Sequence, residues 1–96
     1  MTSHATHVIA AALAAATPVN ALPLAASGWR DTTRIAAGDP QLWLPILLTN
    51  RGQVLKSLNK FEKVLAAFRV AVQRGDAARL VQLLDAGKKT RDSLGS

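Results

Sequence analysis

The stretch Ser27–Trp43, SGWRDTTRIAAGDPQLW, decides the fold of this 96-residue chain. The residues before Gly38 favour a helix over about 24–37, and Gly38 suits the left-handed residue that follows a helix end. Asp39 then provides an N-cap, and Pro40 occupies the first position of a new helix, where proline is tolerated. The stretch therefore predicts two helices separated by one sharp break.

The same stretch contains an Arg-Asp-x-x-Arg cluster. On one continuous helix Arg30 and Arg34 would stack on the same face, with Asp31 close enough to Arg34 to form an ion pair. Two guanidiniums so placed repel each other by roughly 0.2–0.5 kcal/mol, a cost that a surface helix has no need to carry. Because the guanidinium fork suits bidentate capture of carboxylates or phosphates, the spacing predicts a small-anion site.

Before this stretch, an alanine-rich run predicts a helix from Ser3, a suitable N-cap, to about Ala16. His4 and His7 fall on one face of this helix. They are interpreted as solvent-exposed or capping histidines, as a pair that faces a polar cavity, or as metal ligands. Because the chain has no cysteine and this helix has no carboxylate, the metal interpretation is the weakest of the three.

After the break, a third helix is expected to carry Trp43, with Pro45 either kinking it or delaying its start. An interruption at residues 50–52 separates it from the longest helix, Gln53–Arg74. Heptad spacing places six apolar residues of this helix in one stripe, which three more widen. The stripe consists of Val54, Leu58, Phe61, Leu65, Phe68 and Val72, and is widened by Leu55, Val64 and Ala71. Such a stripe can face the chain's own core on one side and a second subunit on the other.

Gly75 ends the long helix and Asp76 caps a last one. We expect this last helix to be buried by four apolar residues, Leu80, Val81, Leu83 and Leu84. No stretch has the alternation that is typical of a strand. The predicted fold is therefore all-α, a single helical domain over residues 1–96 with about five helices, in which helix 53–74 forms a dimerisation core.

Composition limits the possible classes of function. At 96 residues and 10.2 kDa there is room for one domain with one core. Acidic residues interrupt the basic ones that give a net charge of +6, so we expect no nucleic-acid binding. No apolar run approaches the roughly 20 residues of a membrane span, and the N-terminal region lacks the basic residues of a signal peptide. The absence of cysteine is consistent with a reducing compartment, and we expect a cytoplasmic protein.

The sequence contains no nucleophile–base arrangement, glycine-rich phosphate loop, metal cluster or paired carboxylates. Cationic and aromatic groups are present without a catalytic base in an obvious position. From the residues alone, the chain is expected to supply half of a site.

Three motifs occur in order: Ser3-His4-Ala5-Thr6-His7, Gly28-Trp29-Arg30-Asp31-Thr32-Thr33-Arg34 and Asp39-Pro40. A long apolar helix follows them after Asn50. Across nearly the whole chain, this pattern resembles the C-terminal domain of prephenate and arogenate dehydrogenases.

The resemblance implies an oxidoreductase of tyrosine biosynthesis that uses NAD or NADP to oxidise prephenate or arogenate, with loss of the ring carboxylate. In that family an N-terminal Rossmann domain holds the cofactor and supplies the catalytic histidine, whereas the helical C-terminal domain forms a homodimer and closes the substrate pocket. This chain has no G-x-G-x-x-G motif. We therefore expect it to contain no catalytic, cofactor-binding or metal-binding residue and to be inactive alone. Between an excised domain and a natural stand-alone chain, we favour excision.

The resemblance also implies five substrate-binding residues. Arg34 matches the arginine that holds a substrate carboxylate, and Arg30 and Asp31 match positions near an ionic network at the pocket mouth. His7 matches a histidine that faces the substrate side chain. Trp43 matches an aromatic residue of the pocket wall.

Several alternatives stay open at this point. His4 matches the other histidine of the family without a defined role, Thr6 stands where many relatives have proline, and Trp29 where many have phenylalanine. Trp43 as plain core packing and His7 as an exposed or capping histidine are also open. Two other functions compete: a stand-alone regulatory or interaction module, and a basic helical nucleic-acid binder, whose binding would be salt-sensitive.

Overall fold

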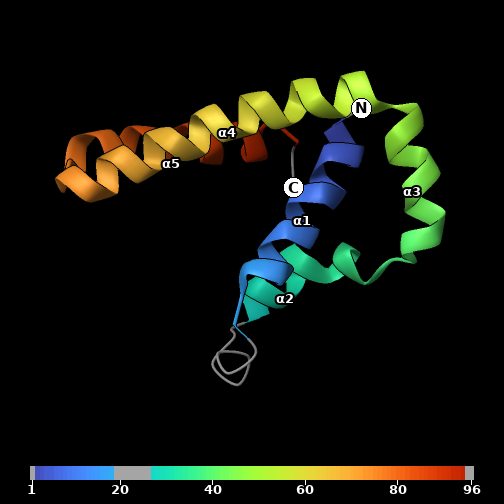
Figure 1. The fold of residues 1–96 in the computed structure, drawn as a ribbon. Helices are drawn as coiled ribbons and strands as arrows, with labels where there is room; N and C mark the ends of the chain where they lie inside the picture. Colours follow the sequence, from blue (N-terminus) through green and yellow to red (C-terminus); the bar gives the residue numbers. More distant parts are fainter. Residues whose placement is uncertain (1, 19–26, 95–96) are drawn as a thin grey trace. The chain divides into compact units, whose positions relative to one another are not determined.

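The computed structural model describes residues 2–18 and 27–94. It contains α1 (Thr2–Ala16), α2 (Ser27–Thr33), the 3-10 helix η2 (Arg34–Ala37), α3 (Pro40–Thr49), α4 (Arg51–Arg74) and α5 (Ala77–Asp92) (Figure 1). No strand occurs in this part of the chain, and the predicted all-α fold is confirmed. The contacts divide the chain into two compact units, Met1–Leu58 and Asn59–Ser96.

In the first unit, α1 packs against α2 and η2. Ala5 and Ala10 of α1 are only 3% and 2% exposed, and such small side chains let neighbouring helices approach closely. The indole Nε1 of Trp29 in α2 donates a 3.0 Å hydrogen bond to the hydroxyl of Thr17, directly after α1. Because α1 begins one residue before Ser3, the predicted N-cap at Ser3 is wrong.

The continuous helix predicted over 24–37, whose first three residues lie outside the described part, is also wrong. The backbone changes from α-helix to 3-10 helix between Thr33 and Arg34. The hydroxyls of Thr32 and Thr33 each donate a 2.8 Å hydrogen bond to the carbonyl four residues earlier, and such bonds weaken and bend helices. Arg30 and Arg34 therefore do not lie on one continuous α-helix.

The sharp break is confirmed, but its mechanism differs from the predicted one. Gly38 is extended, with φ −62° and ψ 157°, so the expected left-handed conformation is wrong. Asp39 is the N-cap of α3: its carboxylate accepts a 3.0 Å hydrogen bond from the amide of Gln41, and Pro40 is the first helical residue. The break therefore results from the start of α3, where Asp39 is the N-cap and Pro40 the first helical residue.

A short interruption separates α3 from α4. Asn50 lies between them, and its side-chain amide donates a 2.7 Å hydrogen bond to the carbonyl of Ile46. The long helix consequently begins at Arg51, two residues before the predicted Gln53. Pro45 lies inside α3 and does not delay its start.

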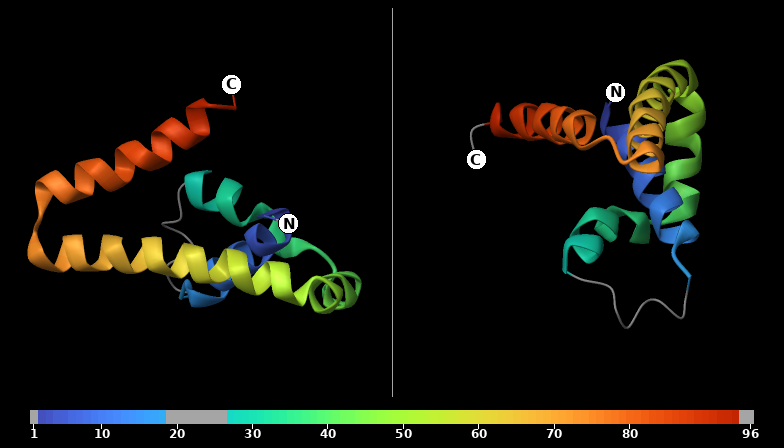
Figure 2. Two further views of the ribbon diagram at one scale, coloured as in Figure 1. Left: turned by 90° about the horizontal axis from the view of Figure 1, so that it is seen from above. Right: turned by 90° about the vertical axis from the view of Figure 1, so that its left-hand side faces the viewer.

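In the second unit, the end of α4 and α5 diverge from a tight connection (Figure 2). Gly75 has a φ of 62°, its amide donates to the carbonyl of Val72, and the amide of Asp76 donates to that of Ala71. This pattern is a Schellman motif, which uses glycine in the left-handed region. Asp76 caps α5 by accepting a 3.0 Å hydrogen bond from the amide of Arg79. Both predicted roles are confirmed.

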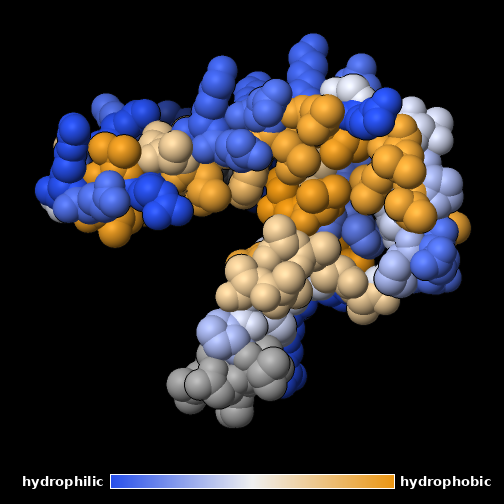
Figure 3. Space-filling view, viewed as in Figure 1, coloured by the Kyte–Doolittle hydropathy of each residue, from blue (hydrophilic) through white to orange (hydrophobic). Residues whose placement is uncertain are grey.

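The prediction that four apolar residues bury α5 is only half right. Leu80 and Leu83 are half-buried, whereas Val81 and Leu84 are 64% and 62% exposed. Figure 3 shows hydrophobic side chains among the hydrophilic ones on the surface of this helical pair. Within the described residues, no helix combines the length and apolarity needed to cross a membrane.

The glycines of the second unit provide a test of these backbone assignments. Gly75→Ala should lower the free energy of unfolding by about 1–2 kcal/mol, because a Cβ in the left-handed region meets the carbonyl oxygen. Gly87→Ala in α5, where nothing lies within 4 Å of the added Cβ, should instead raise it by up to about 1 kcal/mol. Urea unfolding of both variants measures the difference, and equal effects would contradict the assignment.

Candidate functional site

A stacked pair of rings, His7 and Trp43, forms the centre of the candidate site in the first unit. The ring centroids are 3.9 Å apart and the planes are inclined by 22°. His7 of α1 is 8% exposed, and Trp43 in the first turn of α3 is half-buried. The stack joins two helices that are distant in sequence, and the interpretation of His7 as an exposed residue is wrong.

His4 lies on the edge of the same cluster. Its ring centroid is 6.2 Å from that of Trp43, with the planes at 75°. The Nδ1 atoms of His4 and His7 are buried and have no hydrogen-bond partner among the described residues. A buried polar atom without a partner costs about 1–3 kcal/mol, so both atoms favour a polar group supplied from outside the described residues.

A metal ion is poorly supported as that outside group. In residues 2–18 and 27–94, no three His, Asp or Glu side chains are grouped so that they could hold a metal ion. The pair His4 and His7 therefore has no third protein ligand in this part of the chain, whereas metal sites ordinarily take three or four.

Gly38 lies against both rings of the stack, which the sequence did not indicate. A Cβ built on Gly38 would lie 2.9 Å from Nε1 of Trp43 and 3.1 Å from Cε1 of His7. Non-bonded carbon atoms are most stable about 3.5–4.0 Å apart, so a side chain does not fit there. A glycine just past a helix end is common for conformational reasons, and only the tertiary contact reveals this second role.

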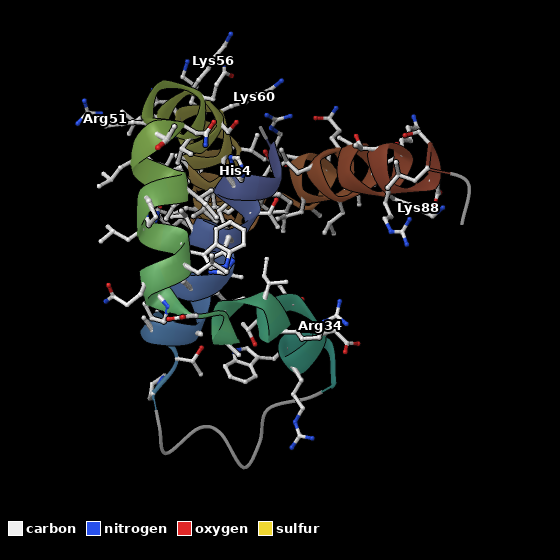
Figure 4. The ribbon with its side chains drawn as sticks, turned by 90° about the vertical axis from the view of Figure 1, so that its right-hand side faces the viewer. His4, Arg34, Arg51, Lys56, Lys60 and Lys88 are labelled. Carbon is white, nitrogen blue, oxygen red and sulfur yellow. The ribbon has the colours of Figure 1, made fainter. Side chains whose placement is uncertain are left out.

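The three charged residues of the predicted anion site are exposed. Arg30 and Asp31 project from α2, and Arg34 begins η2, which packs against α1. Within the described residues none of them has an ion-pair partner, and the predicted Asp31–Arg34 pair is not formed. Figure 4 shows Arg34 well separated from His4 on a different element. The structure therefore brings His4, the stacked rings and Gly38 together, and leaves the charged residues outside that cluster.

This arrangement is suited to binding. The stack offers an aromatic surface beside two imidazole nitrogens that have no partner in residues 2–18 and 27–94, and the guanidiniums are accessible to an anion. No hydrogen bond between a carboxylate and His7 occurs in the described part of the chain, so no acid–base relay is present there. The described groups, an aromatic stack with two imidazoles and exposed guanidiniums, are of the kinds that bind an anionic or aromatic ligand.

Comparison with known proteins gives this helical site its context. Residues 1–86 match the family described as "Prephenate dehydrogenase, dimerization domain". The chain is 36% identical to the prephenate dehydrogenase of Bacillus subtilis (strain 168), over 96% of this chain and 26% of that protein. It is 34% identical to the prephenate dehydrogenase of Lactococcus lactis subsp. cremoris (strain MG1363), over 74% of this chain and 20% of that protein.

A third relative is named for a different activity. The cyclohexadienyl dehydrogenase of Zymomonas mobilis subsp. mobilis (strain ATCC 31821 / ZM4 / CP4) is 33% identical over 98% of this chain and 34% of that protein. The chain thus spans between a fifth and about a third of the length of these relatives. No solved structure gives a significant match. On the match over residues 1–86, the chain belongs to the prephenate dehydrogenase dimerization domain family.

Proposed function

We propose that this chain is the substrate-closing and dimerisation domain of an NAD(P)-dependent prephenate or arogenate dehydrogenase of tyrosine biosynthesis, which oxidatively decarboxylates its substrate. The chain acts as one helical domain, residues 1–96, together with a Rossmann domain of the same protein. It supplies substrate-binding groups, and the catalytic and cofactor-binding residues come from outside it. Neither nucleic acid nor a membrane is a partner.

One observation carries the proposal: in a chain of this family, a buried His7 stacks on Trp43 beside two unpaired imidazole nitrogens. A substrate ring can pack against an aromatic surface of this kind. A hydroxyl or carboxylate of the substrate would also pair an Nδ1 atom and remove the cost of leaving it buried alone. We therefore place His7 and Trp43 against the body of the substrate.

The charge of the substrate supports the second part of the site. Prephenate is a dicarboxylate, and a planar guanidinium matches a carboxylate in both charge and geometry. We assign Arg34 to one carboxylate, because it is exposed on η2, the element that packs against the histidine helix. Arg30 and Asp31 are assigned to an ionic network at the pocket mouth, which a second subunit would complete.

The residues of this chain do not fit a nicotinamide cofactor. Dinucleotides bind where a strand leads through a glycine-rich turn into a helix. The described ranges contain helices only, and the sequence has no G-x-G-x-x-G. We therefore assign NAD or NADP to the Rossmann domain.

A homodimer is the last part of the proposal. An open groove of about 420 Å³ lies between α4 and α5 in the second unit. Its lining is mostly apolar and consists of Val64, Phe68, Leu83, Leu84, Ala86, Gly87, Lys88 and Thr90. Burial of apolar surface contributes about 25 cal/mol per Å², so a helix of a second copy in this groove would stabilise both chains. The dimerization domain named in the family description supports this assignment.

Steady-state turnover of the full-length protein tests the proposal. Prephenate and arogenate are each supplied with NAD or NADP, and reduced cofactor is followed by absorbance. We expect turnover with at least one pair and none from the 96-residue chain under the same conditions. Absence of turnover with all four pairs would contradict the dehydrogenase and favour a regulatory or interaction module, whereas turnover by the 96-residue chain would contradict its assignment as half of a site.

A further inference from the structure

We infer that Gly38 is a positioning residue: its missing side chain sets the place of the His7–Trp43 stack, and through it the substrate-contacting face of His7. This inference rests on the proposed function, because it deepens the account of the same site. Gly38 itself touches no substrate in this account. It acts through the two rings, because the absence of a Cβ at Gly38 leaves the room that they occupy.

A side chain at position 38 would be too close to both rings of the stack. A Cβ at position 38 would meet Trp43 at both Nε1 (2.9 Å) and Cδ1 (3.2 Å), and His7 at Cε1 (3.1 Å). One methyl group would therefore press on both members of the stack at once. Since the ring centroids are only 3.9 Å apart, the rings have no room to yield toward each other. An alanine at this position must displace His7, Trp43 or the backbone that carries them.

Conformation does not explain the glycine. With φ −62° and ψ 157°, Gly38 lies in the extended region that any residue adopts. Gly75, at φ 62°, is the contrasting case, in which the backbone itself requires glycine. Gly28 and Gly52 differ again, because no atom of the described residues lies within 4 Å of a Cβ at either position. Among these glycines, close approach of side chains is the requirement at Gly38 alone.

The consequence for the site follows from the position of Trp43. His7 stacks on its indole and His4 meets the same ring system at an edge, so a shift of the indole moves the surroundings of both imidazoles. Misplacing a substrate-contacting group by about 1 Å can reduce the efficiency of an enzyme by about a hundredfold. Gly38 is thereby linked to substrate recognition without a substrate contact of its own.

The test uses four forms of the full-length protein: wild type, Gly38→Ala, Trp43→Phe and the double variant. We expect Gly38→Ala to raise KM for the substrate about tenfold, and to leave KM for the nicotinamide cofactor within about twofold. General destabilisation would lower the amount of active enzyme and move neither KM. Gly28→Ala is the matched control, since its added Cβ meets open space, and it should leave both KM values unchanged.

The double variant relieves the closest of the three contacts, that with Nε1 of Trp43, and leaves the 3.1 Å contact with Cε1 of His7 in place. Phenylalanine lacks Nε1, the Trp43 atom nearest to the added Cβ. We expect Gly38→Ala to raise the substrate KM less than about threefold in the Trp43→Phe background, a coupling that contacting residues show. Equal effects of Gly38→Ala in the two backgrounds, or a substrate KM matching that of Gly28→Ala, would overturn the inference.

Thermal unfolding of the same four proteins keeps the inference separate from the proposed function. If the wild type turns over no substrate, the proposed function fails, and coupling between positions 38 and 43 in melting temperature still tests the contact. We expect Gly38→Ala to lower the melting temperature clearly more in the Trp43 background than in the Phe background. If Gly38→Ala alone does not fold, recovery of folding in the double variant supports the contact, and a double variant that also fails to fold contradicts it.

Discussion

Arg34→Ala in the full-length protein should raise KM for prephenate or arogenate by at least about 30-fold. A guanidinium that is desolvated against a substrate carboxylate contributes about 2–5 kcal/mol, and about 1.4 kcal/mol corresponds to each factor of ten. The effect belongs to substrate binding, because Arg34 has no ion-pair partner among the described residues whose loss would disturb the fold. KM for the cofactor and the melting temperature should therefore change little.

Two further variants test whether a positive charge alone explains the effect of Arg34 on the substrate KM. Arg34→Lys keeps the charge and removes the bidentate fork, so it should recover only part of the lost affinity. Arg69→Ala, which removes another exposed arginine from the second unit, should leave the substrate KM unchanged. A substrate KM for Arg34→Ala that equals the wild-type value would show that Arg34 is only a surface residue.

The second large effect concerns the oligomeric state. Leu84→Glu should raise the dissociation constant of the dimer at least about 100-fold, because it replaces an apolar side chain of the groove with a carboxylate that a second copy would have to desolvate. Sedimentation equilibrium of the full-length protein measures this change. Val81→Glu is the matched control, since Val81 is as exposed as Leu84, 64% against 62%, and does not line the groove.

These variants also distinguish a fold defect from a dimer defect. Both residues are exposed on α5 of the single chain, so neither substitution removes a buried contact. We expect the helical content of both variants to match that of the wild type. A wild-type protein that sediments as a monomer at tens of micromolar, or a Leu84→Glu variant that dimerises like Val81→Glu, would contradict the proposed interface.

The helix ends were predictable from the sequence where a few neighbouring residues decide them. Asp39 caps α3 and Asp76 caps α5, each by accepting a backbone amide hydrogen bond from within the next three residues. Gly75 ends α4 because the backbone there adopts a left-handed conformation. Caps and helix ends of this kind depend only on a few neighbouring residues, so the sequence is sufficient to predict them.

The family resemblance implied that His7 and Trp43 belong to the pocket, but the contact between their rings was not predictable, because it joins residues distant in sequence. From the residues alone, His7 was open to interpretation as an exposed or capping residue, as one of a pair facing a polar cavity, or as a metal ligand, and only the packing of α1 and α3 places its ring on Trp43. Gly38 received a conformational explanation, because sequence cannot show which side chains approach a glycine. The role of Arg34 in carboxylate binding stays a prediction, as do those of Arg30 and Asp31.

The long helix illustrates a third limit. Its heptad spacing predicted a wide apolar stripe, but spacing does not show which part is covered by the same chain. In the structure Ala71 is 2% exposed whereas Val72, the next residue, is 65% exposed. The same limit applies to α5. Its apolar residues indicated burial, but spacing does not show whether the same chain or a second copy covers them.

The central claim is that this chain holds the carboxylate of the substrate. A crystal structure of the full-length protein with bound substrate tests it through the distance between the Arg34 guanidinium and the nearest substrate carboxylate oxygen. We expect a charge-assisted hydrogen bond of about 2.7–2.9 Å, with the substrate ring beside His7 and Trp43. A substrate whose carboxylates are bound by other cations, with Arg34 in solvent, would contradict it.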